Sequence, residues 1–243
     1  MIDNDFIKTH TLLECLQEFK GARKHKKLSR RDSVTEEFKA LAKKLLYGGH
    51  FVVSDNENNE IVKIELCSVE FYYHEEKDDL VDKNDKEDDI IRDPIMYHRN
   101  PIGGKAKPPF KTGVLNPHQS GIDITFEDYS EGKEAKDVVY RASALIRSFY
   151  YTKKGKKEMD SCSTHLYDFF LNNSPLTPNA EIKIKWVETP EEIQDELFWG
   201  HRLNVYKDKE KQELDERNWG FAKEKITINH NNKTTEEYNS IES

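Results

Sequence analysis

The amino-acid sequence predicts a single α+β domain, in which a mostly antiparallel sheet carries flanking helices. Residues 61–74 form the longest β-prone run, rich in β-branched and aromatic residues and free of Gly and Pro. Shorter runs at residues 121–127 and 182–188 alternate between apolar and polar side chains, as half-buried strands do. Helical signals lie before and after these strands, which favours the α+β class.

The first elements follow from apolar spacing and from capping residues. Apolar residues at helical spacing predict a short helix over residues 5–19, and the basic stretch KGARKHKKLSRRDS follows as a linker. Ser33 or Thr35 offers an N-cap for a second helix, which we expect to end at the Gly-Gly pair before the strands. Residues 51–54 and 60–74 are predicted as the two strands of a hairpin.

Loops and shorter elements fill the rest of the chain. The acidic run EEKDDLVDKNDKEDD predicts a solvated loop, and Pro-rich loops follow it. In residues 121–127, Ile122, Ile124 and Phe126 share one face, whereas Asp123, Thr125 and Glu127 share the other. The remaining pattern predicts a strand over residues 138–149, a helix over 161–172, a strand over 182–188 and a helix start at Thr189.

The chain divides into three parts on this basis. Residues 1–34 form an N-terminal helix and basic linker, residues 35–225 form the α+β domain with an acidic insertion at 75–92, and residues 226–243 form a flexible tail. No run approaches the roughly 20 apolar residues that span a membrane. The N-terminus lacks the plan of a signal peptide. We therefore expect a cytoplasmic monomer with no membrane partner.

Charge and motifs narrow the range of functions. The net charge of −8 argues against general nucleic-acid binding, although basic clusters lie at residues 20–31 and 141–157. The three cysteines are widely spaced, and the sequence has no zinc-binding, metalloprotease, P-loop, dinucleotide-binding or nucleophile-elbow motif. We therefore expect no metal and no cofactor. Single polar groups at strand ends remain as candidates: Glu70, Tyr72, His98, Asp123 and Arg147.

The order of these residues resembles that of the alkyladenine (3-methyladenine) DNA glycosylases. The resemblance covers residues 35–205 and is closest to a divergent, uncharacterised branch of that superfamily. The similar segments are LAKKLL at 41–46, VEFY at 69–72, DPIMYHR at 93–99, GIDITF at 121–126, ALIRS at 144–148 and HRLNV at 201–205.

The resemblance implies a glycosylase-like fold, similar to the barrel of the formyltransferase C-terminal domain. It also implies release of a modified purine base from DNA by hydrolysis of the N-glycosidic bond. Glu70 would activate water, and His98 would position Glu70, its water or the sugar phosphate. Arg147 would contact phosphate or buttress the pocket. The implied substrate-binding residues, which would hold the base, are Tyr72, Tyr97, Arg99 and Asp123.

Two features of this sequence depart from the family. Asp123 stands where the family has Asn, which places a second carboxylate in the pocket. The segment PPFKTGVLNPHQ replaces the one that supplies the wedge filling the gap left by the flipped base, and Phe110 or Leu115 is the candidate substitute. Glu65 competes with Glu70 for the catalytic role, and simple alternation predicts these two residues on opposite faces of the strand.

Other interpretations of the same residues stay open. Glu70 alternatively marks the point where the strand leaves the core, and Arg147 is alternatively an ion-pair partner of Asp123. The two tyrosines are then core or rim residues, and His98 is a surface loop residue. The protein would be a non-catalytic protein that binds a base, nucleoside or nucleic acid, or an interaction protein with an inert sheet.

Overall fold

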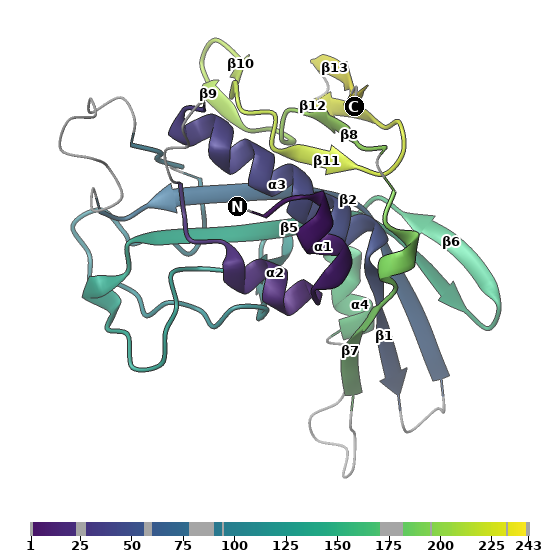
Figure 1. The fold of residues 1–243 in the computed structure, drawn as a ribbon. Helices are drawn as coiled ribbons and strands as arrows, with labels where there is room; N and C mark the ends of the chain where they lie inside the picture. Colours follow the sequence, from purple (N-terminus) through teal and green to yellow (C-terminus); the bar gives the residue numbers. More distant parts are fainter. Residues whose placement is uncertain are drawn as a thin grey trace.

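The fold is organised around helix α3 (Arg30–Tyr47), which packs against the centre of a large antiparallel sheet (Figure 1). The computed structural model describes residues 2–22, 28–55, 60–77, 90–93, 95–170, 182–194, 196–231 and 233–241. Phe38 of α3 is fully buried. Its ring stacks on Phe71 with 4.5 Å between centroids and meets Trp219 edge-on at 5.1 Å. Gly48 is the C-cap of α3, as the Gly-Gly pair predicts.

Helix α3 begins earlier than the sequence predicts. Ser29, rather than Ser33 or Thr35, is the N-cap, because its hydroxyl accepts the amide hydrogen of the third helical residue at 3.1 Å. Arg30 falls in the predicted solvated linker, but it is 2% exposed and forms a buried ion pair with Glu75. The ion pair with Glu75 allows the first turn of α3 to be buried, whereas the charge of Arg30 by itself predicts exposure to solvent.

The predicted N-terminal helix is two short helices, α1 (Asn4–Thr9) and α2 (Leu12–Glu18). Thr11 breaks the run, because it forms a capping box with Glu14 and so starts a new helix. Ile7 and Leu16 are buried in the same core as Phe38. The N-terminal helices therefore pack into the core of the domain, rather than only preceding it.

The main sheet joins ten of the described strands, and every described pair is antiparallel. The mixed α+β class predicted from the sequence is confirmed. Strands β1 (Gly49–Asp55) and β2 (Glu60–Glu75) form the predicted hairpin, and β5 (Tyr140–Lys153) runs along β2. The flanking strands are β3 (Leu115–His118), β4 (Gly121–Thr125), β6 (Lys156–Asp160), β7 (Ile182–Glu188), β8 (Phe198–Gly200), β11 (Gly220–Ala222) and β14 (Asn239–Ser240).

Paired irregularities interrupt the alternation of β2 and β5. The register shifts between Leu66 and Val69 on β2, where Ser68 faces Ser148 and Val69 faces Ile146. The core cluster that contains Phe38 includes alternate residues of β2 on each side of the shift: Ile64 and Leu66 on one side, and Val69, Phe71 and Tyr73 on the other. The residues of β5 in this cluster are Phe149, which pairs with Leu66, and Ile146 and Ala144, which pair with Val69 and Phe71. Glu65 and Glu70 each lie between two core residues, so they point to the same side of β2. The prediction that they lie on opposite faces is wrong, because a bulge inverts the alternation of a strand.

The C-terminal residues form strands. Besides β14, the chain after residue 205 builds the ribbons β9 (Tyr206–Asp208) with β10 (Glu213–Leu214), and β12 (Thr227–His230) with β13 (Thr234–Glu237). Tyr238 is 2% exposed, and its hydroxyl donates to the carbonyl of His201 at 2.7 Å. The prediction of a flexible tail is wrong for the described residues, because a polar composition does not reveal a buried tyrosine that anchors the segment.

Other predicted elements are shorter than expected. Within the helix predicted over 161–172, the described residues form a 3₁₀ turn, η3 (Ser163–His165), followed by α4 (Leu166–Phe170), and residues 171 and 172 lie outside the described residues. The helix start at Thr189 gives only the 3₁₀ turn η4 (Pro190–Glu192), and η2 (Ala135–Asp137) is a further such turn. Most of the acidic insertion, residues 78–89, lies outside the described residues.

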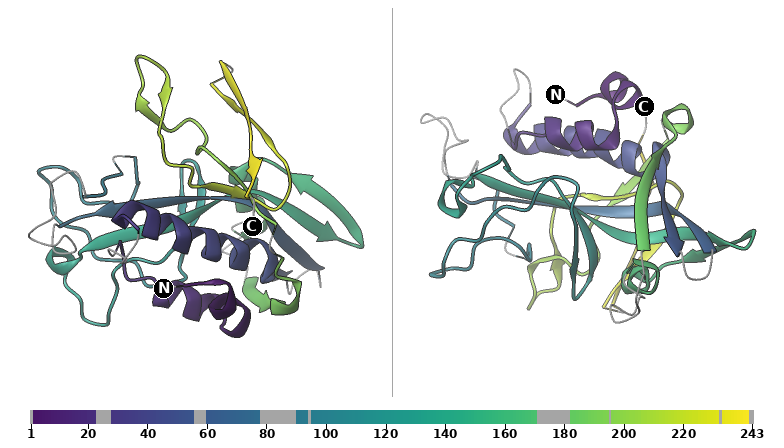
Figure 2. Two further views of the ribbon diagram at one scale, coloured as in Figure 1. Left: turned by 45° about the horizontal axis from the view of Figure 1, so that its top comes forward. Right: turned by 90° about the horizontal axis from the view of Figure 1, so that it is seen from below.

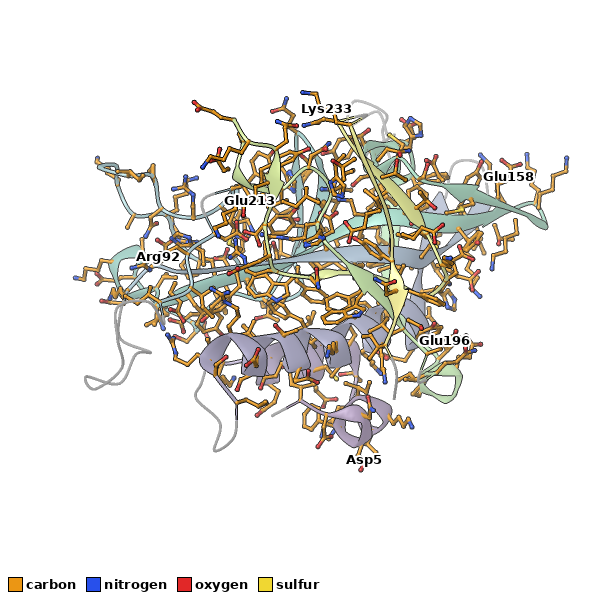
Figure 3. All side chains as sticks on the ribbon, turned by 90° about the horizontal axis from the view of Figure 1, so that it is seen from above. Asp5, Arg92, Glu158, Glu196, Glu213 and Lys233 are labelled. Carbon is orange, nitrogen blue, oxygen red and sulfur yellow. The ribbon has the colours of Figure 1, made fainter. Side chains whose placement is uncertain are left out.

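The central sheet separates two layers. Helices α1, α2 and α3 lie on one face of the β2–β5 region, and the ribbons β9–β10 and β12–β13 project on the other (Figure 2). Side chains fill the layer between α3 and the sheet, whereas Asp5 and Glu158 lie at the periphery (Figure 3). Among the described residues, no helix combines the length and apolar character needed to cross a membrane. The face opposite α3 carries the polar residues of the site.

Candidate functional site

Glu70 lies at the centre of the candidate site, on β2 between β5 and β11. Its side chain is 1% exposed and is held by three donors. Nη2 of Arg147 lies 2.7 Å from Oε2, and the Tyr72 hydroxyl donates to the same oxygen at 2.8 Å. The amide of Leu203 donates to Oε1 at 2.6 Å. Because a carboxylate has about four lone-pair positions, Oε1 retains room for a further donor.

The neighbours of Glu70 are fixed in charge and in orientation. Burial by itself lowers the pKa of Arg147, but the charge of Glu70 outweighs it and raises this pKa above its ordinary value. Burial, together with Glu70, raises the pKa of Tyr72, so the phenol keeps its proton and can donate it in a hydrogen bond. The Arg202 guanidinium lies 4.6 Å from the centre of the Tyr72 ring and is held by a buried ion pair with Asp93.

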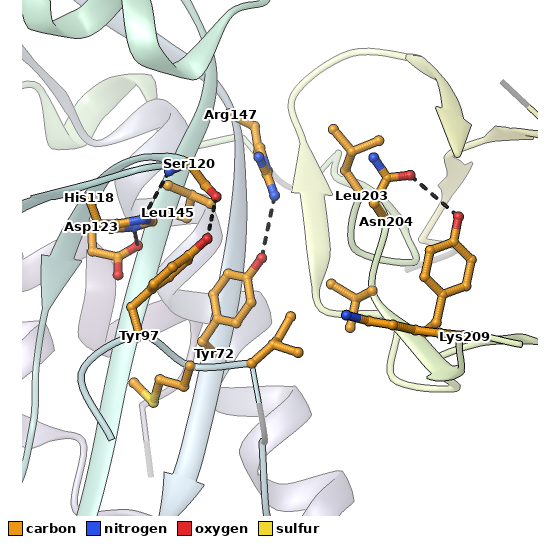
Figure 4. Close-up of a pocket in the computed structure, with 14 residues that line it drawn as sticks. Tyr72, Tyr97, His118, Ser120, Asp123, Leu145, Arg147, Leu203, Asn204 and Lys209 are labelled. Atoms are coloured by element: carbon orange, nitrogen blue, oxygen red, sulfur yellow. Dashed lines mark hydrogen bonds and ion pairs between the residues drawn. The ribbon is translucent and has the colours of Figure 1, made fainter. Parts of the chain in front are cut away.

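A pocket of about 280 Å³ opens beside the Glu70–Arg147 ion pair, and we call it the tyrosine pocket (Figure 4). One wall carries Tyr72, Tyr97 and Asp123, and the opposite wall is the chain segment 203–209. The lining combines aromatic, apolar and polar groups, as small-ligand pockets do. Its full lining is Tyr72, Ile95, Met96, Tyr97, His118, Ser120, Asp123, Leu145, Arg147, Leu203, Asn204, Val205, Tyr206 and Lys209.

Asp123 is the tyrosine-pocket end of a row of buried charges. Its Oδ2 lies 3.4 Å from Nε2 of His98, whose Nδ1 contacts Glu127. Arg141 follows in the row: its Nη1 lies 2.8 Å from Oε2 of Glu127, and its Nε lies 2.6 Å from Oε1 of Glu76. We call these five side chains the charge row. A buried charge is tolerated when it is paired in this way.

The pKa shifts within the charge row follow from this pairing. Burial lowers the pKa of His98, but hydrogen bonds and charge interactions with Asp123 and Glu127 outweigh it and raise the pKa to about 8. Burial raises the pKa of Asp123, but the nearby rings of His118 and His98 outweigh it and lower this pKa below its ordinary value. At neutral pH His98 is therefore mostly a cation between two carboxylates.

A second pocket, of about 450 Å³, adjoins the tyrosine pocket and shares Arg147 and Leu203 with it. Glu70 lines this second pocket, so the Glu70–Arg147 pair stands at the boundary between the two. The hydroxyls of Ser68 and Ser148 are 2.6 Å apart. The remaining lining residues of the second pocket are Val69, Met159, Ser161, Ile226, Thr227, Ile228, Asn229 and Tyr238.

The wall formed by the segment 203–209 is held in place by the β12–β13 ribbon, which we call the C-terminal ribbon. The amide of Asn204 donates to Nδ1 of His230 at 3.0 Å, and Nε2 of His230 lies 3.1 Å from Glu236. Glu236 also accepts the amide hydrogen of His201 at 3.0 Å. These contacts bracket Leu203, whose amide reaches Glu70. The C-terminal ribbon thus positions one donor to the central carboxylate.

The structure brings most of the predicted site residues together. Glu70, Tyr72 and Arg147 form one hydrogen-bonded group, so the alternative pairing of Arg147 with Asp123 is wrong. Tyr97 lines the tyrosine pocket; it is 51% exposed, and its hydroxyl lies 2.8 Å from that of Ser120.

Two predicted site residues lie elsewhere. His98 is buried and contacts Asp123 and Glu127 rather than Glu70, so the expectation that it positions Glu70 is not met. Arg99 does not line the tyrosine pocket, and its Nη1 donates to the carbonyl of Asn100 at 3.3 Å. Both residues belong to the loop that follows β2, where the sequence has no periodicity from which to predict side-chain direction.

The competition between Glu65 and Glu70 is decided by their partners. Glu65 lies 3.2 Å from Nζ of Lys63 and 2.9 Å from Nζ of Lys157, and it lines neither of the two adjoining pockets. Glu70 lines the second pocket and is bonded to Arg147 at the boundary. The carboxylate that reaches the candidate site is therefore Glu70.

Several residues of the site escape prediction from the sequence. The similarity of HRLNV to a family motif points to residues 201–205, but the role of the Leu203 amide has no side-chain signal. Tyr238 and Glu236 fall in the segment predicted as a tail. His118 falls in a Pro-containing segment with no regular pattern, yet its ring packs at a tilt against Tyr97 with 4.3 Å between centroids.

Within the part of the chain that the structure describes, no group of three or more His, Cys, Asp and Glu side chains is placed to hold a metal ion. Comparisons with protein-family models, with curated proteins and with solved structures found no match.

Proposed function

We propose that this protein hydrolyses N-glycosidic bonds, with Glu70 as the group that activates water. The observation that carries this proposal is the state of the Glu70 carboxylate. It is buried, paired with Arg147, and left with one unused acceptor position at the boundary of a tyrosine-lined pocket. A base would occupy the tyrosine pocket, and its sugar would lie at the boundary.

The reaction at this boundary is a displacement of the base by water. The water oxygen forms a bond to the anomeric carbon of the sugar as its proton passes to Glu70. The bond from that carbon to the base nitrogen breaks, and its electron pair leaves with the base, which then takes up a proton. The negative charge of the site stabilises the positive charge that develops on the sugar.

We further propose that the fold is that of a divergent alkyladenine glycosylase. The order of α3, the β1–β2 hairpin, β4 and β5, with Glu70 on the second hairpin strand, supports this proposal. The two candidate wedge residues do not support insertion into a duplex. The Phe110 ring lies edge-on to His98 with 5.6 Å between centroids, and Leu115 packs against the core. We therefore favour a modified purine in an unpaired strand or a nucleoside as substrate, over one stacked in duplex DNA.

A second candidate function is binding of a base or nucleoside without hydrolysis. The observation that favours it is the number of donors that the protein itself supplies to Glu70, which are Arg147, Tyr72 and the amide of Leu203. A carboxylate held so firmly also serves as a structural anchor for Arg147 and for the segment 203–209.

Base release separates the two candidates. We would incubate the protein with single-stranded and duplex oligonucleotides and with nucleosides carrying hypoxanthine, ethenoadenine or a methylated purine, and detect the free base by chromatography. Glu70→Gln should lower the release rate by about 10²–10⁴-fold, the usual contribution of a general base. Glu65→Gln is the matched control, because Glu65 lies on the same strand but pairs with surface lysines.

The outcomes are distinct. Release that falls with Glu70→Gln and stays unchanged with Glu65→Gln supports hydrolysis at the proposed site. Release that both variants retain would show that Glu70 is not the activating group. No release with any substrate, combined with thermal stabilisation of the native protein by a nucleoside, would favour the binding function. Circular dichroism spectra of both variants establish that they fold.

A further inference from the structure

The pocket-lining carboxylate Asp123 has an acceptor atom that no described residue satisfies. Asp123 is 3% exposed, and its Oδ1 receives no hydrogen bond from the described residues, although Nε2 of His118 lies 3.2 Å away. A buried acceptor left without a donor costs free energy, and water or a ligand usually completes it. Because Asp123 lines the tyrosine pocket, a ligand in that pocket can supply the missing donors.

The surroundings of Asp123 keep it an acceptor. The amide of Ser120 donates to Nδ1 of His118, so Nδ1 is an acceptor and the ring carries a hydrogen on Nε2, which lies 3.2 Å from Oδ1 of Asp123 but outside the geometry of a hydrogen bond. On the other side, Asp123 ends the charge row, in which the carboxylates of Asp123, Glu127 and Glu76 outnumber the cations His98 and Arg141. An ionised carboxylate only accepts hydrogen bonds, so this end of the pocket repels carbonyl oxygens and unprotonated ring nitrogens.

We propose that the tyrosine pocket selects bases that present two neighbouring N–H donors, as guanine does, and that Asp123 is the residue that determines this specificity. The inference rests on the proposed function only in placing a base in this pocket. Guanine presents two neighbouring donors, its N1 hydrogen and its exocyclic amine. These two donors match the two oxygens of one carboxylate. Adenine pairs an acceptor with a donor on the same edge, and hypoxanthine has no amine beside its N1 hydrogen.

The size of the pocket fits a single base. Its volume of about 280 Å³ lies just below the range of about 300–1,000 Å³ that is typical of ligand pockets. Tyr72 and Tyr97 stand on the same wall as Asp123, and Leu203 and Asn204 face them from the other wall (Figure 4). A planar ring between these walls can direct its donor edge at Asp123 while its sugar extends to Glu70.

Binding of matched bases tests this proposal. The probes are guanosine, inosine and adenosine, and short oligothymidylates carrying one guanine, one hypoxanthine or one adenine, measured by calorimetry at pH 7. Guanosine and inosine differ only in the exocyclic amine. The native protein should bind the guanine probes about tenfold or more tightly than the hypoxanthine probes, which corresponds to about 1.4 kcal/mol.

Asp123→Asn provides the second arm, because an amide offers one donor and one acceptor in the place of two acceptors. This variant should lose the preference for guanine and bind inosine at least as well. The control is Asp128→Asn, which replaces a carboxylate paired with Lys133 outside the pocket and should keep the native preference.

Native protein that binds guanine and hypoxanthine probes equally, or binds neither, would overturn the proposal, and this holds even if Asp123→Asn does not fold. A preference for guanine that survives in Asp123→Asn would overturn the role of Asp123. The result is independent of the hydrolysis test. Selective binding without base release would contradict the proposed hydrolysis alone, and base release without selectivity would contradict this inference alone.

Discussion

His98 makes the stability of this fold depend on pH in a direction that the structure defines. It is buried between the carboxylates of Asp123 and Glu127, and these raise its pKa to about 8 although burial opposes the shift. In the unfolded chain the pKa of a histidine is about 6.5. The folded state therefore binds a proton at His98 more tightly than the unfolded state does.

The sign and size of the effect follow by linkage. A group whose pKa is higher in the folded state stabilises fully at pH values below its unfolded pKa, and this stabilisation is lost as pH rises through the folded pKa. For His98 the loss falls between about pH 6.5 and pH 8. A difference of about 1.5 pKa units, at about 1.36 kcal/mol per unit, amounts to about 2 kcal/mol of the free energy of unfolding.

Urea unfolding of the native protein and of His98→Gln, followed by tryptophan fluorescence at pH 6 and pH 9, measures this contribution. The free energy of unfolding of the native protein should fall by about 2 kcal/mol more than that of His98→Gln over this range. The comparison with the variant is needed because the pKa of His201 is raised by Glu236, which adds a loss of the same sign. Equal pH dependence of the two proteins would refute the reasoning, as would an imidazole NMR titration of His98 centred below pH 6.5.

Two further predictions concern the core and the C-terminal ribbon. Phe38→Ala should lower the free energy of unfolding by about 3–5 kcal/mol, because it removes a buried ring stacked on Phe71; a loss below 1 kcal/mol in urea unfolding would contradict this. Glu236→Gln should lower the hydrogen-exchange protection of the Asn204 amide about tenfold, because Glu236 holds the His230 ring that accepts this amide hydrogen. Glu237→Gln, at a carboxylate that pairs with a surface lysine, should leave the protection unchanged. Equal protection in both variants would exclude the positioning role of Glu236.

Local patterns in the sequence predict several elements correctly. The β1–β2 hairpin follows from two β-prone runs around a polar turn, and the end of α3 follows from Gly48. The alternation of residues 121–127 holds, with Ile122, Ile124 and Phe126 in the core and Asp123 on the face of the tyrosine pocket. These predictions succeed because each depends on side-chain spacing within one short segment.

Long-range contacts account for the predictions that fail. Arg30 is buried because Glu75, 45 positions away, forms an ion pair with it. The described residues of the predicted tail, 226–231 and 233–241, pack on the sheet through the buried ring of Tyr238 and the side chains of Glu236 and His230, although the composition of this segment is that of a solvated tail. The direction of the His98 side chain is likewise set by Glu127 rather than by its own loop.

The paired irregularities of β2 and β5 explain how the central ion pair comes to lie in the site. If alternation continued unbroken, Glu70 would share the face of Leu66, and Arg147 would share the face of Phe149, both of which belong to the apolar core. A bulge in one strand alone would turn only one of the two charges toward the site and leave the other buried without its partner, at a cost of several kcal/mol. Because both strands are irregular at the same point, Glu70 and Arg147 turn together to the face opposite α3, where Leu203 completes their hydrogen bonds. The two irregularities therefore depend on each other, since neither is compatible with the observed core without the other.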